Sequence, residues 1–181
     1  VRDAILAADI ASISTPVCPT HFAVAITSIV NNFSSNGGII AINMGCDLNT
    51  SIQCKNLSEK YDVVYFGAGW HPQDVSYCNN EDFDKLMNLT SHPKCVCVGE
   101  VGLDYYFEPY DKIKQQEVFI KQIEVASKTR LPLSIHSRDA TLDMVNILKE
   151  YKSKLDFSGT LHCFSGSKET AKILLDLGLF F

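Results

Sequence analysis

Three short apolar segments of this chain each end in a residue that can bind a metal ion. These residues are Glu100, His136 and His162. If the segments are strands of one parallel sheet, the three side chains leave from the same edge, where α/β enzymes place their active sites. The sequence therefore predicts a metal centre at the edge of an α/β sheet, in a chain that is part of a metal-dependent hydrolase.

Apolar runs alternate with amphipathic runs over most of the chain. The apolar runs are nearly continuous stretches of Val, Ile, Leu and Cys, which is typical of parallel strands covered on both faces. Helical spacing predicts helices over residues 115–129 and 139–151, and Ser167 can cap a further helix that ends before Gly178. The strand candidates are residues 38–45, 63–69, 94–100, 131–136, 159–163 and 179–181. Within them, we predict adjacent parallel strands at residues 39–45, 63–67, 95–100, 133–136 and 160–163.

This alternation fits two architectures, an open doubly wound sheet and a (β/α)8 TIM barrel. The sequence has no G-x-G-x-x-G turn and no P-loop, one of which an open sheet usually carries. Successive strands that end in potential ligands favour the barrel, because a closed ring of strands aims its ends at one site. Since a complete barrel takes about 250 residues, we expect the 181 residues to be a fragment of about five βα units, incomplete at both ends.

Charge and composition limit the partners. The formal net charge of −5 argues against a broad basic surface for nucleic acid. It does not exclude an enzyme that acts on nucleic acid, because bound divalent cations reverse the local charge. No apolar run approaches the ~20 residues of a membrane span, and the seven cysteines lack the paired spacing of a zinc ribbon. We expect buried thiols, a cytoplasmic location with the nucleus as the alternative, no membrane partner and a monomer.

Four motifs carry a resemblance to a known family. They are Gly69-Trp70-His71-Pro72 and the stretches 99–106, 116–140 and 162–167. In order and spacing they resemble the TatD family of metal-dependent deoxyribonucleases over residues 38–181, whereas residues 1–37 match poorly. The resemblance implies a single TIM-barrel domain of the metal-dependent hydrolase type. It also implies that the domain binds two divalent metal ions (Mg²⁺, Mn²⁺ or Zn²⁺) and hydrolyses phosphodiester bonds of a DNA substrate, trimming strand ends.

The resemblance assigns metal ligands. Glu100 would bridge the two ions and act as a catalytic residue, and His136 and His162 would bind one of the ions. Phosphodiester hydrolysis needs a hydroxide at neutral pH and compensation of the charge on the phosphoryl oxygens, and two ions about 3.5–4 Å apart supply both. A carboxylate can bridge two cations, while neutral imidazoles complete their coordination.

Three further residues are candidates for contact with the substrate. By resemblance His71, also a catalytic candidate, would lie at the cavity rim and contact the phosphate or the leaving oxygen. Arg138 is placed to bind a phosphate through its planar set of donors. Ser165 belongs to a turn that leads into a helix, and the first N–H groups of that helix can receive an anionic oxygen.

The chain departs from the family pattern in two places. The family's first strand ends in a His-x-His pair, and the nearest match here is Thr20-His21-Phe22-Ala23, with Ala23 in place of the second His. A late metal-binding Asp of the family would fall beyond residue 181. Because Glu100, His136 and His162 are three donors where the pattern offers about six, we expect this chain alone to be a poor nuclease.

Each candidate also has a structural alternative. A lone His at a strand end is often a hydrogen-bonded core residue, and His71 precedes a proline and can simply shape a loop. Arg138 can pair with a carboxylate such as Asp143. Asp104 can pair locally or touch the substrate, and we expect His92 to face solvent.

Two other functions remain open. One is a deacylase or amidohydrolase activity on the same metal scaffold, although no Lys stands at a strand end to bridge two metals by carbamylation. The other is an inactive truncated paralogue that serves as a binding module, which the missing His pair favours. Substrate profiling would separate the nuclease from the deacylase or amidohydrolase.

Overall fold

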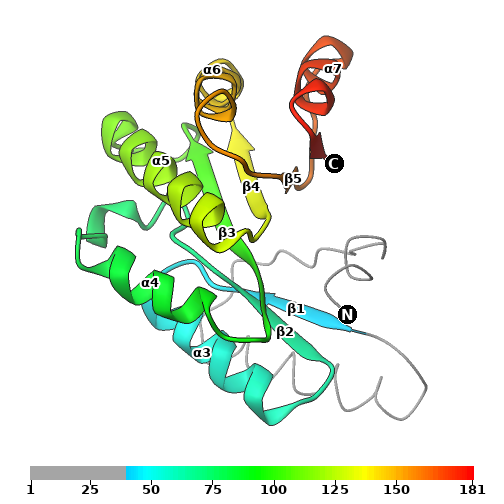
Figure 1. Cartoon of the computed structure of the whole chain (residues 1–181). Coiled ribbons are helices and arrows are strands. Elements are labelled where there is room, and N and C mark those ends of the chain that lie inside the picture. The colour runs from blue at the N-terminus through cyan, green and yellow to red at the C-terminus, as the bar shows by residue number, and fades with distance from the viewer. Residues whose placement is uncertain (1–39) are drawn as a thin grey trace. The chain divides into compact units, whose positions relative to one another are not determined.

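Six parallel strands make up the sheet of residues 40–181, the part of the chain that the computed structural model describes. Their order is β1-β2-β3-β4-β5-β6, and each strand pairs with the next one along the chain. Figure 1 shows the helices arranged along one side of the sheet. The predicted partial barrel of parallel strands is confirmed for the described residues. The strands are β1 Ala41–Met44, β2 Val64–Ala68, β3 Cys95–Asp104, β4 Leu133–Arg138, β5 Gly159–Leu161 and β6 Leu179–Phe180.

The two central strands extend further than the apolar runs predicted. β3 continues to Asp104 because, beyond a shift in register, its last four residues pair with β4. Glu100 therefore lies inside β3 and His136 inside β4, whereas His162 directly follows β5. The prediction that each ligand ends its strand is wrong for the first two. Backbone pairing continues past Glu100 because Val101 and Leu103, which follow it, are buried in the core.

The three predicted helices are present. α5 spans Lys112–Thr129 and begins earlier than predicted, because the Asp111 side chain accepts a hydrogen bond from Lys114 N at 2.9 Å. α6 spans Thr141–Lys152, and α7 spans Lys168–Asp176. The Ser167 hydroxyl caps α7 at Thr170 N, 3.2 Å away, and Gly178 follows with a φ of 77°.

Two helices and a short 3₁₀ turn were not predicted. α3 spans Leu48–Lys60, and its buried residues are Ser51, Cys54 and Ser58. This face is small and polar, so the sequence shows no apolar periodicity there. η1 spans Val75–Tyr77, and α4 spans Asp82–Thr90.

The core lies between the sheet and the helices. Phe66 of β2, Phe119 of α5 and Leu148 of α6 are fully buried in one apolar cluster with the strands. Burial of such side chains contributes about 1.5–3 kcal/mol each, which fixes the strands and therefore the edge that carries the site. Among residues 40–181, no helix has the length and apolarity that a membrane crossing needs.

The cysteines follow the prediction in part. Cys54, Cys78, Cys95 and Cys97 are buried, whereas Cys163, the residue after His162, is exposed. Burial raises the pKa of the Cys54 thiol to about 12. A buried thiol of this kind stays protonated at neutral pH and packs as a small apolar group.

Candidate metal centre

Three histidines surround the carboxylate of Glu100. Its Oε1 atom lies 3.2 Å from His136 Nδ1, 2.5 Å from His162 Nε2 and 3.8 Å from His71 Nε2. The ring centroid of His136 lies 4.7 Å from that of His71 and 5.4 Å from that of His162. The predicted convergence of Glu100, His136 and His162 is therefore observed, and His71 joins them. Their roles as ligands remain a prediction.

Local backbone geometry aims Glu100 into the site. The register of β3 against β4 shifts between Val98 and Val101, and an irregularity of this kind re-aims the side chains within it. Glu100 N donates a hydrogen bond to Gly45 O, 3.0 Å away and just beyond β1. At Gly102 the φ is 137°, and a Cβ atom would lie 2.0 Å from the His136 carbonyl oxygen. Glycine there lets the two ligand-bearing strands approach closely.

His136 has the surroundings of a metal-binding histidine. Its Nε2 lies 3.0 Å from Asp104 Oδ2, a carboxylate oxygen that can only accept when ionised. This partner favours a ring proton on Nε2, so that Nδ1 is the nitrogen that faces Glu100. Nδ1 and Glu100 Oε1 lie 3.2 Å apart and share either a second proton or a cation. A carboxylate behind the far nitrogen is the usual partner of a metal-bound imidazole.

The His162 ring supplies a test of whether the residues fit a metal ion. Its Nε2 atom is buried and pairs with Glu100 Oε1 at 2.5 Å, and it has no other partner among the described residues. A buried ring nitrogen that faces only a carboxylate is a suitable ligand for a divalent cation once it has lost its proton. The donor set of imidazole nitrogens and one carboxylate therefore fits a metal ion.

His71 differs from the other two histidines. Together with Glu100 and His136 it forms a group whose potential ligand atoms lie within 4.8 Å of one another. However, its Nδ1 accepts a hydrogen bond from Gln73 N at 3.2 Å, which places the proton of the neutral ring on Nε2. Burial is the largest influence on this ring and lowers the pKa of His71 to about 4. At pH 7 the Nε2–H group is then a neutral donor that points into the site.

The carboxylate of Glu100 is ionised in these surroundings. Burial alone would raise its pKa, but His136 and His162 together outweigh burial and hold the pKa of Glu100 well below its ordinary value. In turn, Glu100 raises the pKa of His162 to about 9. Metal binding would displace the proton that His162 carries at neutral pH.

Three buried polar residues hold the site in place, and the sequence had marked only Asp104 among them as a candidate. Asp104, only 1% exposed, accepts hydrogen bonds from Gln73 Nε2 and Tyr106 N in addition to its contact with His136. The hydrogen bond from Tyr106 N is a local pairing of the kind that the sequence suggested, and the contact with His136 adds support for a candidate ligand. A contact of Asp104 with the substrate stays a prediction.

The other two are glutamines of α5. The Gln115 amide accepts from Asp104 N at 2.9 Å and donates to Asp104 O at 2.8 Å. The Gln122 amide makes the same pair of bonds with Trp70, at 2.7 and 3.1 Å. Both glutamines are buried, and the spacing of seven residues places them on one face of the helix. Two glutamines on the apolar face of a helix were the available signal.

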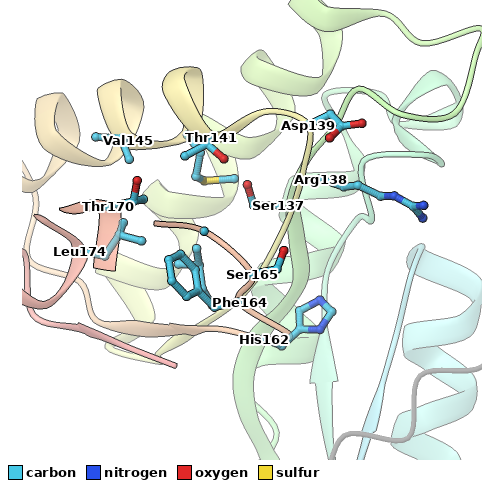
Figure 2. A pocket seen from close by; sticks show the side chains of 13 residues that line it. Ser137, Arg138, Asp139, Thr141, Val145, His162, Phe164, Ser165, Thr170 and Leu174 are labelled. Atoms are coloured by element: carbon cyan, nitrogen blue, oxygen red, sulfur yellow. The ribbon is translucent and has the colours of Figure 1, made fainter. Parts of the chain in front are cut away.

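A cavity of about 350 Å³ lies beside His162. Its lining includes the predicted substrate-binding residues Arg138 and Ser165 (Figure 2). In Figure 2, Ser165 lies next to His162, and the Arg138 side chain extends away from the cavity. Arg138 does not use Asp143, which instead pairs with Lys112 at 2.8 Å.

The prediction that His92 faces solvent is wrong. Its side chain is 18% exposed, and its ring centroid lies 5.5 Å from that of Phe66. His92 Nδ1 also accepts a hydrogen bond from Lys94 N. The His92 ring therefore packs against the core just before β3 begins, away from the candidate metal centre. His21 lies outside the described residues.

Comparison with known proteins gives consistent matches. The family model described as TatD related DNase matches residues 18–181. YabD of Bacillus subtilis (strain 168), named an uncharacterized metal-dependent hydrolase, is 39% identical over 137 residues, 76% of this chain and 53% of YabD. The protein of Citrobacter koseri named 3'-5' ssDNA/RNA exonuclease TatD is 32% identical over 136 residues, 75% of this chain and 52% of that protein. The chain thus spans about half the length of these relatives.

Comparison with solved structures finds a similar fold in a TatD homologue. The crystal structure of YJJV, a TatD homologue from Escherichia coli K12, matches with a TM-score of 0.77 at 24% identity, covering 87% of this chain and 61% of that one. At this identity the match concerns the fold alone, and it agrees with the partial barrel of β1 to β6.

Proposed function

Because the chain belongs to the TatD related DNase family of metal-dependent hydrolases, we propose that it hydrolyses phosphodiester bonds of DNA and removes nucleotides from strand ends. The observation that carries this proposal is the cluster of three imidazoles around the single carboxylate of Glu100. The name of the Citrobacter relative, an exonuclease of single-stranded DNA and RNA, supports the choice of substrate.

The proposed ligands are Glu100, His136 and His162. A divalent cation held by them, Mg²⁺, Mn²⁺ or Zn²⁺, would supply a hydroxide nucleophile at neutral pH and neutralise charge on the phosphoryl oxygens. We propose two such ions in the complete site, with Glu100 between them. The low pKa of Glu100 keeps its carboxylate ionised, and Asp104 holds the His136 ring with Nδ1 toward Glu100.

The remaining residues bind and orient the substrate in this proposal. The His71 Nε2–H group donates a hydrogen bond to a phosphate oxygen or to the leaving oxygen, and it does so as a neutral ring because its pKa is about 4. Arg138 offers charged donors beside the cavity, and Ser165 lies at its edge next to the start of α7. These donors would fix the scissile phosphate within reach of the ligand cluster. The substrate is the only partner we propose, for a monomer located in the cytoplasm or the nucleus.

The test is hydrolysis of a single-stranded oligonucleotide labelled at its 5' end, with Mn²⁺ present. We expect slow shortening from the 3' end that stops on addition of a chelator and is lost in Glu100→Gln. Glu117→Gln, a matched change on the exposed face of α5, should leave the rate unchanged.

Two results would favour the other readings. Hydrolysis of N-acyl substrates without any cleavage of DNA would identify a deacylase or amidohydrolase. Tight Mn²⁺ binding with no hydrolysis of either substrate class would identify a binding module.

A further inference from the structure

We propose that Tyr106, Phe107 and Arg138 form a platform on which one unpaired nucleobase of the substrate stacks. This inference rests on the proposed action on nucleic acid, and it assigns a specificity-determining surface beside the same site. The three residues are called the stacking platform below.

The stacking platform consists of planar groups in contact. The Arg138 guanidinium carbon lies 3.7 Å from the centre of the Tyr106 ring and 4.8 Å from the centre of the Phe107 ring. The two rings meet edge to face, with centroids 4.8 Å apart and an angle of 89° between their planes. A guanidinium at this distance is held by the ring through a cation–π interaction.

These groups are nevertheless open to solvent. Tyr106 is 53% exposed and Phe107 is 50% exposed, and Arg138 is also exposed. An isolated exposed aromatic residue needs no explanation. Two adjacent ones that share a cation, in a chain of net charge −5, form a local cationic and aromatic surface. Aromatic faces together with Arg are what proteins use to bind single-stranded nucleic acid without reading its sequence.

The stacking platform is joined to the candidate metal centre through Asp104. One oxygen of this carboxylate lies 3.0 Å from His136 Nε2, and the other accepts a hydrogen bond from Tyr106 N at 3.0 Å. Arg138 pairs in register with Asp104 across β3 and β4. Arg138 also follows His136 by two residues, about 7 Å along an extended strand. A base attached to a phosphate at the ligand cluster is therefore within reach of the stacking platform.

A base favours this surface more than a second phosphate does. A phosphate would engage only the edge of Arg138 and leave both aromatic rings exposed to water. A purine or pyrimidine covers a ring face and can also stack on the guanidinium plane, and such stacking is worth about 1–3 kcal/mol per base. A paired base in a duplex keeps its faces covered by its neighbours, so the occupant is an unpaired base.

The experiment measures binding, so that it does not depend on catalytic rate. The probe is a short single-stranded DNA with a non-hydrolysable phosphorothioate backbone, titrated with the 181-residue chain in Mn²⁺. A set of these DNAs carries an abasic site at one position each. For the unaltered chain we expect one position, close to the strand end, at which loss of the base weakens binding by about 5- to 100-fold.

The double variant Tyr106→Leu, Phe107→Leu should bind the complete and the abasic strand equally. Tyr77→Leu replaces a tyrosine that is 78% exposed on η1 and should keep the discrimination. Placing 2-aminopurine at the sensitive position of the DNA adds a direct signal. Stacking should quench its fluorescence when the strand binds the unaltered chain and not when it binds the double variant.

Three results would overturn the proposal, and they are distinguishable. If the unaltered chain binds every abasic strand as tightly as the complete strand, the stacking platform is refuted and the proposed function is left intact. Discrimination that persists in the double variant places the base elsewhere. No binding of any strand by the unaltered chain refutes the action on nucleic acid itself.

Discussion

The side-chain amide of Gln122 makes two hydrogen bonds with the backbone of Trp70, the residue immediately before His71. An amide that bonds both the N–H and the C=O of one residue replaces the partner that a neighbouring strand would have offered. Gln115, two turns earlier in α5, does the same for Asp104. One helix therefore positions the ends of two strands that carry site residues.

Gln122→Met should destabilise the protein by about 2–4 kcal/mol, because two buried backbone groups of Trp70 lose their partners. The free energy of unfolding in urea measures this effect. Gln53→Met, an exposed change on α3, should stay within about 0.5 kcal/mol of the unaltered chain. Equal stability of the two variants would show that water replaces the amide at Trp70.

Glu100→Gln should abolish the stabilisation that Mn²⁺ gives to the fold. Glu100 Oε1 lies within 3.8 Å of a ring nitrogen of each of the three histidines, and an amide cannot supply its charge. Thermal unfolding at increasing Mn²⁺ concentration measures this, since a ligand that binds only the folded state raises the midpoint. If Glu117→Gln and Glu100→Gln respond alike, the cation binds elsewhere.

Asp104→Asn should weaken Mn²⁺ binding by roughly 10- to 100-fold without removing it, as expected when the partner behind a metal-bound imidazole changes. The loss arises because an amide no longer fixes the proton on His136 Nε2. Calorimetric titration gives the affinity, and Asp62→Asn, exposed and before β2, is the control. An unchanged affinity in Asp104→Asn would argue against His136 as a ligand.

Acid should remove a contribution of Asp143 to stability. A hydrogen bond from Lys112 holds the pKa of Asp143 below its ordinary value of 3.8. Since the folded pKa is the lower one, the stabilisation is fully present above the unfolded pKa and is lost as the pH falls through the folded pKa. Asp143→Asn should therefore be less stable than the unaltered chain at pH 7, and the difference should vanish in strong acid. A difference that is independent of pH would exclude the ion pair as its cause.

Gly102→Ala should destabilise the fold by more than about 3 kcal/mol, because its φ of 137° is unfavourable and the new Cβ would meet the His136 carbonyl oxygen. Gly178→Ala is a matched comparison. Gly178 has a φ of 77° with no atom near the position of a Cβ, so only backbone strain of about 1–2 kcal/mol applies. Circular dichroism during denaturant titration compares the two.

The sequence predicted the strand order and the ligand cluster because both depend on short-range patterns. Apolar runs mark buried strands, and parallel strands bring Glu100, His136 and His162 to one edge. The register shift that turns Glu100 inward depends on pairing between β3 and β4, which no local pattern encodes. α3 escaped prediction because its buried face is made of Ser51, Cys54 and Ser58.

The supporting residues were harder to predict than the ligands. The roles of Gln115 and Gln122 require the backbone of Asp104 and Trp70 to be in place, so they follow only from the tertiary structure. The contact of Arg138 with Tyr106 likewise joins β4 to the loop after β3, and the sequence had suggested a phosphate or a carboxylate for this side chain.

The two oxygens of Asp104 divide their contacts between His136 and the backbone of Tyr106. A change in the position of either neighbour is therefore transmitted to the other through one rigid carboxylate. If a base on Tyr106 tightens the hold of the site on its cation, the cation must tighten the hold on the base by the same factor, because coupling between two binding events is reciprocal. Metal concentration then acts as a control on how firmly a strand is retained, before any bond is broken.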